Sequence, residues 1–123
     1  MKEIKTDKAP AAIGPYSQAV ICGNLLLTSG QIPVDPATGT IPEGISAQAD
    51  RVLLNLKNLL DSAGTSMDNV VKTTLFITNM DDFPIVNEIY STYFNKPYPA
   101  RSCVEVSKLP KNVLLEIEAV AEI

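Results

Sequence analysis

Hydrophobic and polar positions follow two different periods along this chain, and the changes between them divide it into elements. From residue 45 to residue 63 the apolar positions recur with the 3.6-residue period of one helical face. These positions are Ile45, Ala49, Val52, Leu53, Leu56, Leu59, Leu60 and Ala63. Gly64 follows where a helix commonly ends. The pattern predicts a long amphipathic helix.

The N-terminal part of the chain has the pattern of a β-hairpin. Residues 17–22 and 25–29 are short runs of β-forming residues, joined by Gly23–Asn24, which suits a two-residue turn. Residues 32–44 contain many prolines and glycines, and we expect a turn-rich loop there.

Three more segments are typical of strands: residues 70–78, 101–106 and 113–120. In the first, the positions expected on the buried side are Val71, Leu75 and Ile77. In the last, one side carries Val113, Leu115, Ile117 and Ala119, and the other carries Leu114, Glu116, Glu118 and Val120. The mixed second face fits a partly buried subunit interface that contains a polar site, although an ordinary solvent-facing sheet would give the same mixture.

A second helix is expected between residues 70–78 and 101–106. Asp81 or Asp82 can cap it, and Pro84 fits its first turn. Its apolar stripe consists of Val86, Ile89, Tyr90, Tyr93 and Phe94. The order ββ-α-β-α-ββ predicts one α+β domain over residues 1–123, with a mixed sheet and both helices on one of its faces.

Composition narrows the classes of function. The formal net charge is −4 and the ten basic residues are scattered, which argues against nucleic acid as a partner. The first residues lack the apolar stretch of a signal peptide, and no segment has the length of a membrane span, so we expect a cytosolic protein. Cys22 and Cys103 are then expected to be free thiols.

The chain contains no histidine. This absence removes the usual general base, the Ser-His and Cys-His nucleophile pairs, and the commonest transition-metal ligand. Chemistry must therefore rely on carboxylates, arginine, tyrosine, thiol, amine, backbone groups or ordered water.

The most informative segment for chemistry is the strand at residues 101–106. Arg101 and Cys103 share one of its sides, and an arginine fork binds a carboxylate through two parallel hydrogen bonds. If the following strand forms a hairpin with this one, Glu116 comes near Arg101 and can hold a water molecule. A surface ion pair for Arg101, a small buried apolar role for Cys103 and a solvated Glu116 are the alternatives.

Two N-terminal segments add candidate ligand contacts. Tyr16 lies just before the first hairpin strand, and Ser29 and Gly30 lie at the end of the second. A glycine there permits a ligand to approach the backbone closely, whereas ordinary turn formation is the simpler explanation.

These segments together resemble the RidA/YjgF family over nearly the whole chain. The motifs that carry the resemblance are residues 12–19 (AIGPYSQA), 28–33 (TSGQIP), 87–90 (NEIY), 99–106 (PARSCVEV), 109–110 (LP) and 116–119 (EIEA). Because Arg101 and Glu116 are both present, the chain is most similar to the deaminating RidA subgroup. Residues 95–98 form a shorter connection than in some members, which leaves the pocket rim and the substrate size open.

The resemblance implies a chorismate-mutase-like two-layer α+β fold and a homotrimer with a central barrel and sites between subunits. It implies hydrolysis of reactive 2-imino and enamine acids, such as 2-iminobutanoate and 2-iminopropanoate, to 2-oxo acids and ammonia, which protects PLP enzymes and needs no metal or cofactor.

Residue roles are also implied by the resemblance. Arg101 would bind the substrate carboxylate with the Gly30 N–H, while Glu116 and the Cys103 carbonyl would position the attacking water. The pocket would be lined by Tyr16, Ser29 and Asn87. A non-catalytic 2-oxo acid sensor, and a ribonuclease or translation inhibitor, are alternatives; the acidic balance and the lack of histidine argue against the latter.

Overall fold

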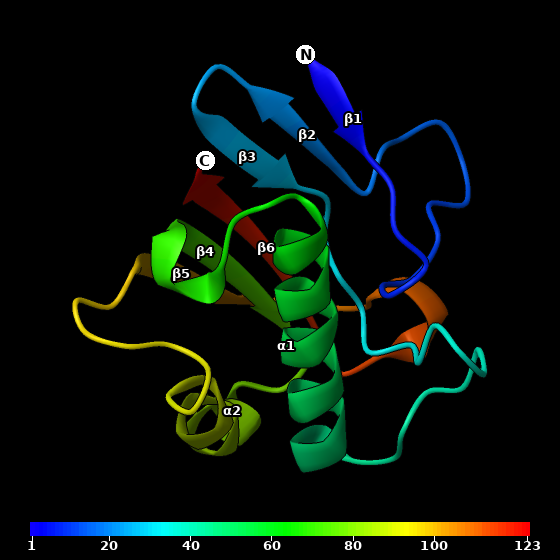
Figure 1. The fold of residues 1–123 in the computed structure, drawn as a ribbon. Coiled ribbons are helices and arrows are strands. Elements are labelled where there is room, and N and C mark those ends of the chain that lie inside the picture. The colour runs from blue at the N-terminus through cyan, green and yellow to red at the C-terminus, as the bar shows by residue number, and fades with distance from the viewer.

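A mixed six-stranded sheet forms the body of the protein in the computed structural model, which describes residues 1–123 (Figure 1). Its strands are β1 (Lys2–Ile4), β2 (Ala19–Cys22), β3 (Leu25–Thr28), β4 (Val70–Ile77), β5 (Ala100–Glu105) and β6 (Leu115–Glu122). They are arranged in the order β1-β2-β3-β6-β4-β5, in which only β4 and β5 run parallel. Short 3₁₀ turns lie at Met67–Asn69, Met80–Asp82 and Pro110–Asn112.

Two helices, α1 (Ile45–Ser62) and α2 (Phe83–Tyr90), lie together on one face of this sheet, as the sequence predicts (Figure 1). The apolar stripe of α1 is buried against the core side of the strands. The fully buried large side chains at this junction include Leu53, Leu56, Leu59, Leu60, Leu75, Ile77, Leu115 and Ile117. Burying each such side chain stabilises the fold by about 1.5–3 kcal/mol, so this layer holds the helices in place.

The end of α1 and the alternation of β6 are confirmed. Gly64 has φ +83°, the left-handed conformation that glycine adopts without strain just after a helix. On β6 the side chains predicted to share the inner side are buried, whereas Glu116 is half-buried and Glu118 is exposed on the other face.

The predicted pattern of β4 is wrong at its start. Val71 is exposed, and Val70 is buried in its place, while Thr73, Leu75 and Ile77 follow the expected alternation. The cause is an irregularity in the pairing with β6 between Val70 and Lys72, which shifts the alternation by one residue.

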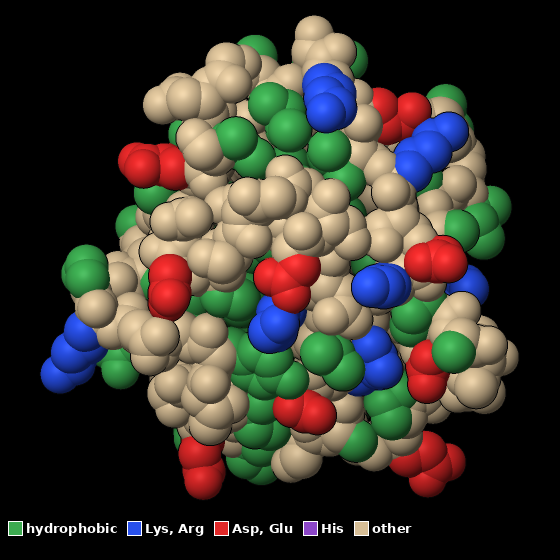
Figure 2. All heavy atoms as spheres, viewed as in Figure 1, with side chains coloured by type: hydrophobic (Ala, Val, Ile, Leu, Met, Phe, Trp, Pro, Cys, Tyr) green, Lys and Arg blue, Asp and Glu red, His purple; other side chains and the backbone are tan.

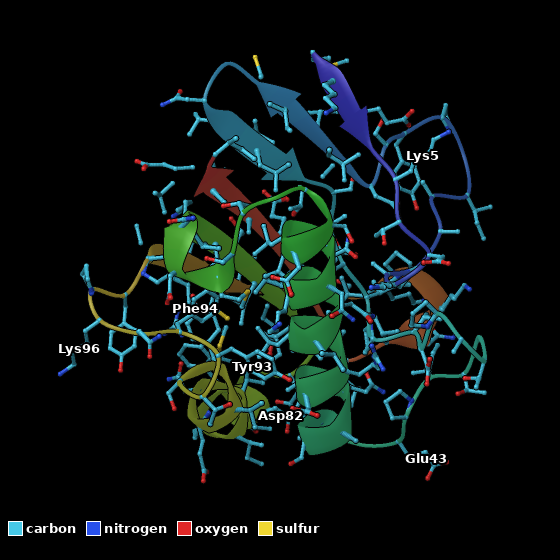
Figure 3. All side chains as sticks on the ribbon, viewed as in Figure 1. Lys5, Glu43, Asp82, Tyr93, Phe94 and Lys96 are labelled. Atoms are coloured by element: carbon cyan, nitrogen blue, oxygen red, sulfur yellow. The ribbon has the colours of Figure 1, made fainter.

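The second helix is shorter than its apolar stripe suggests, because α2 ends at Tyr90. The hydroxyls of Ser91 and Thr92 donate to the carbonyls of Glu88 and Ile89 at 2.7 and 2.6 Å, which competes with further helical bonds. Tyr93 nevertheless reaches back to α1, where its hydroxyl donates to Asp50 Oδ1 at 2.9 Å (Figure 3).

The start of this helix also differs from the prediction. Neither Asp81 nor Asp82 provides a side-chain cap for α2. The side chain of Asn79 caps the preceding 3₁₀ turn by accepting from the Asp81 N–H at 3.0 Å.

The expected hairpin between the last two strands does not form. β4 lies between them, pairing in parallel with β5 and antiparallel with β6. Four side chains are buried on β4 and four on β6, whereas on β5 only Cys103 is as much as half-buried. The two apolar strands therefore take the centre and the polar β5 takes an edge. The other edge strand, β1, was not predicted.

Candidate functional site

Arg101 extends from the edge strand β5 toward α2, on the helix-bearing side of the sheet. Three α2 residues at i, i+4 and i+7 surround its guanidinium: Phe83, Asn87 and Tyr90. The guanidinium carbon lies 5.1 Å from the centroid of the Phe83 ring and 4.9 Å from that of Tyr90. Asn87 Oδ1 accepts a hydrogen bond from Arg101 at 2.7 Å.

The guanidinium of Arg101 has no acidic partner in the chain. No carboxylate lies within 4.0 Å of it, so the surface ion-pair interpretation is wrong for the single chain. Its side chain has five N–H donors, of which one bonds Asn87 and the others find no partner. They border a cavity of about 410 Å³ whose other lining residues are Asn87, Tyr90, Ser91, Tyr98 and Pro99. This is an unpaired cation able to bind an anion.

Tyr90 was predicted from sequence only as part of an apolar stripe. Its ring is buried as expected, but its hydroxyl forms a hydrogen bond of 2.8 Å with Thr73 in the core. Burial raises the pKa of Tyr90, against the opposing effects of the Thr73 hydrogen bond and the Arg101 charge, so the phenol is neutral. The i, i+4, i+7 spacing of Phe83, Asn87 and Tyr90 places these three side chains on one stripe of the helix, and this signal in the sequence was missed.

Glu116 lies on β6, on the sheet face away from the helices. Its carboxylate makes no hydrogen bond or ion pair within the chain. Burial raises the pKa of Glu116 above its ordinary value of 4.5, and the nearby Glu118 raises it further. An unpaired, half-buried carboxylate with a raised pKa is suited to accepting and returning a proton.

Gly30 lies directly against this carboxylate. Leu27 pairs with Val120 of β6, and Gln31 pairs with Ile117. The chain after β3 therefore has one more residue between these pairs than β6 has, and it bulges at residues 28–30. A Cβ on Gly30 would overlap the Glu116 carboxylate and would lie 3.1 Å from its Cγ. The Gly30 N–H has no hydrogen-bond acceptor in the chain. A free N–H therefore lies next to the free acid.

The larger cavity, of about 740 Å³, contains Glu116 and three other predicted site residues: Tyr16, Ser29 and Gly30. Tyr16 is half exposed on its rim. The Ser29 hydroxyl donates to the Ser17 carbonyl at 2.6 Å, so its proton is already committed to the protein. The structure thus brings these four residues together.

Cys103 directs its thiol toward the core and its carbonyl toward the open edge of the sheet. Its side chain packs against the core, and burial raises the pKa of the thiol despite the opposing charge of Arg101, which disfavours a nucleophilic thiolate. The Val106 N–H bonds the Ile77 carbonyl on β4, and successive residues of a strand direct their backbone groups to opposite sides. The Cys103 carbonyl therefore points to the open edge of the sheet.

Within one chain, Arg101 and Glu116 do not meet. They lie on opposite faces of the sheet, two strands apart, and their cavities share no lining residue. The prediction that a hairpin brings them together is wrong, because β4 occupies the place next to β5.

A buried carboxamide, that of Asn55, holds the loop that follows Gly30. Asn55 of α1 is fully buried, and its Nδ2 donates to the carbonyls of Ile32 and Val34 at 3.0 and 2.9 Å. Its Oδ1 accepts two bonds from Arg51, at 3.0 and 2.8 Å. This residue was missed by sequence reasoning, although a polar position beside the apolar stripe of α1 is a visible signal.

The face of the molecule seen in Figure 2 has no extended patch of one charge, and acidic and basic side chains are interspersed over it. None of the helices has both the length and the apolar character needed to cross a membrane.

Comparison with known proteins gives a consistent match along the chain. The family model described as Endoribonuclease L-PSP matches residues 6–123. A protein of Salmonella typhimurium named 2-iminobutanoate/2-iminopropanoate deaminase is 52% identical, covering 98% of this chain and 96% of its own. A RutC family protein of Pyrococcus horikoshii is 53% identical, with 98% of each chain covered.

Solved structures share the fold closely. RidA from the Antarctic bacterium Psychrobacter matches with a TM-score of 0.97 at 45% identity, covering 100% of both chains. Escherichia coli TdcF with bound serine matches with a TM-score of 0.95 at 47% identity, covering 100% of this chain and 99% of the other. With its sequence matched from residue 6 to residue 123 and its fold superposed along the whole chain, the protein belongs to the RidA/YjgF family.

Proposed function

We propose that this protein is an enzyme that hydrolyses small 2-imino acids and their enamine tautomers to 2-oxo acids and ammonia. The observation that carries the proposal is a pair of unpartnered groups, the Arg101 guanidinium and the Glu116 carboxylate, each facing a cavity. Relatives about half identical carry the name 2-iminobutanoate/2-iminopropanoate deaminase, and TdcF binds serine, a small amino acid, which supports a substrate of this size.

A second copy of the chain is needed to complete the site. Neighbouring strands lie about 4.8 Å apart, so two strand spacings and the thickness of the sheet separate Arg101 from Glu116. A 2-imino acid of a few heavy atoms cannot span that separation. In a ring of copies each interface is the same, and the Arg101 cavity of one subunit faces the Glu116 cavity of the next.

The sheet face away from the helices is suited to such an interface. It exposes Leu27 (40%), Val71 (41%) and Val104 (44%), together with the half-buried Phe76. Contact between copies would remove these apolar groups from water, and it supports the homotrimer with a central barrel that the family resemblance implies.

The mechanism follows from the groups at the two cavities. Arg101, with its four free N–H donors, and the Gly30 N–H would bind the substrate carboxylate. The imine carbon is already electrophilic, so the reaction needs an oriented water molecule and a proton route. The Cys103 carbonyl and Glu116 would hold this water.

Proton transfer would run through Glu116. As the water oxygen bonds to the imine carbon, the carboxylate takes a water proton and delivers it to the nitrogen, giving a tetrahedral carbinolamine. Transfer of the hydroxyl proton to nitrogen then expels ammonia and leaves the 2-oxo acid. Burial of Glu116 raises its pKa, which favours the protonated intermediate form.

The test is a coupled assay in which a threonine dehydratase supplies the imine and release of ammonia is followed. Wild type should accelerate release, Arg101→Ala should abolish the acceleration, and Glu116→Ala should lower kcat at least about a hundredfold, while assembly is retained. Saturable 2-oxobutanoate binding without acceleration would instead indicate a sensor. RNA cleavage that persists in Arg101→Ala would favour a ribonuclease.

A further inference from the structure

We infer that Phe83 and Tyr90 are positioning residues that hold the Arg101 guanidinium in one orientation before a ligand arrives. This inference rests on the proposed function, since it concerns the cation that would bind the substrate carboxylate. Neither residue needs to touch the substrate, because both act through Arg101.

The first support is the surroundings of the guanidinium. Its carbon lies 5.1 Å from the Phe83 ring centroid and 4.9 Å from that of Tyr90, within the range of cation–π attraction. The hydrogen bond that Arg101 donates to Asn87 at 2.7 Å fixes one edge of the guanidinium. Three contacts from a single helical stripe thus restrict a side chain that is otherwise flexible.

The second support is that the Tyr90 ring is itself fixed. Its hydroxyl bonds Thr73, which is the residue paired with Arg101 on the neighbouring strand, so helix and strand are tied together beside the arginine. Phe94 packs against the same ring, with centroids 4.4 Å apart. Tyr90 is buried and cannot move without disturbing the core.

The consequence concerns binding more than chemistry. A free arginine loses side-chain freedom when it grips a carboxylate, and an arginine already held in place loses less. Disruption of the aromatic contacts should therefore raise KM, while kcat, which depends on Glu116 and the water, stays near the wild-type value.

Three variants test this in the assembled protein. Phe83→Leu keeps the apolar bulk but removes a ring, and it should raise KM about three- to thirty-fold with kcat nearly unchanged. Tyr90→Phe keeps the ring but frees it from Thr73 and should give a smaller rise. Tyr93→Phe is the matched control: it also removes a helix-proximal tyrosine hydroxyl, but that group bonds Asp50 and touches no Arg101 contact.

A readout that does not depend on turnover separates this inference from the proposed function. In ¹⁵N-labelled protein, the Arg101 Nε–H signal should be sharp and its relaxation restricted in wild type and in Tyr93→Phe. It should become mobile in Phe83→Leu and Tyr90→Phe, even if no deaminase activity is found. Unchanged Arg101 mobility and unchanged KM in both variants, with the fold intact by circular dichroism, would overturn the inference whether or not the protein is a deaminase.

Discussion

The Glu116 carboxylate occupies the space in which any side chain on Gly30 would lie. The bulge at residues 28–30 turns Gly30 toward β6, and the missing side chain lets the acid rest against the backbone beside a free N–H. The acid and the N–H that we assign to the reaction are therefore placed by one local feature of the chain.

Gly30→Ala should reduce kcat at least about a hundredfold, because its Cβ would displace the Glu116 carboxylate from the position in which it would hold the attacking water. The backbone at Gly30 is not in the left-handed region, so alanine itself adds no conformational strain. Steady-state kinetics measures the effect.

The control for this substitution is a double-mutant cycle. In a Glu116→Ala background the obstructing carboxylate is gone, so Gly30→Ala should have little further effect on residual activity. If the two losses simply multiply, the contact between these residues is not the cause.

Glu116→Gln should unfold at a higher urea concentration than wild type at pH 7. Burial raises the pKa of Glu116 above 4.5, so between 4.5 and the folded-state pKa the folded chain binds more protons than the unfolded chain. The free energy of unfolding therefore falls as pH rises through that window, and glutamine removes this loss. The advantage should shrink below pH 4.5, and kcat should fall about 10²- to 10⁴-fold.

Glu43→Gln is the control for this prediction, because Glu43 is exposed on the loop before α1 and points outward (Figure 3). Its stability should match wild type at both pH values, at equal protein concentration. A Glu116→Gln protein less stable than wild type at pH 7 would contradict the assigned effect of burial.

Arg101→Lys should raise KM about ten- to hundredfold, because a lysine keeps the charge but not the flat fork that grips a carboxylate with two bonds. Lys96→Ala is the control, since Lys96 is an exposed cation on the connection that leads into β5 and points into solvent (Figure 3). Steady-state kinetics measures KM for both variants, and Lys96→Ala should leave it unchanged. A KM for Arg101→Lys equal to that of wild type would show that the positive charge alone is enough and that no two-bond contact is needed.

Asn55→Ala should lower the free energy of unfolding by about 1–3 kcal/mol, because it removes both donated bonds and leaves the buried Val34 carbonyl without a donor. Asn58→Ala on the same helix removes a single exposed bond to Lys8 and should cost well under about 1 kcal/mol. Urea unfolding measures the free energy of unfolding of both variants. Similar losses of stability would show that the bonds from Asn55 to the loop contribute little.

Local pattern was enough to predict the elements that depend on local burial. The apolar stripe of α1, the glycine that ends it and the inward side of β6 agree with the structure, since each is set by periodicity within one segment. The order of the strands cannot be read from periodicity within one segment. It depends on which strands are apolar enough for the centre of the sheet, and so the position of β4 between β5 and β6 was missed.

The site could be predicted as a set of residues but not as an arrangement. Motif resemblance singled out Arg101 and Glu116, yet nothing in their spacing indicates that they face opposite sides of the sheet. Irregular pairing at Val70 and at residues 28–30 also changes which side chains face outward, and such bulges have no simple sequence signal.

Whether one site combines Arg101 of one chain with Glu116 of another can be measured by complementation. The Arg101→Ala and Glu116→Ala proteins, each with little or no activity alone, are unfolded, mixed in equal amounts and refolded together. The shared-site account predicts that activity returns to about one quarter of wild type, because about a quarter of the interfaces in random rings join an intact arginine to an intact glutamate. A mixture that assembles normally but stays inactive would contradict it.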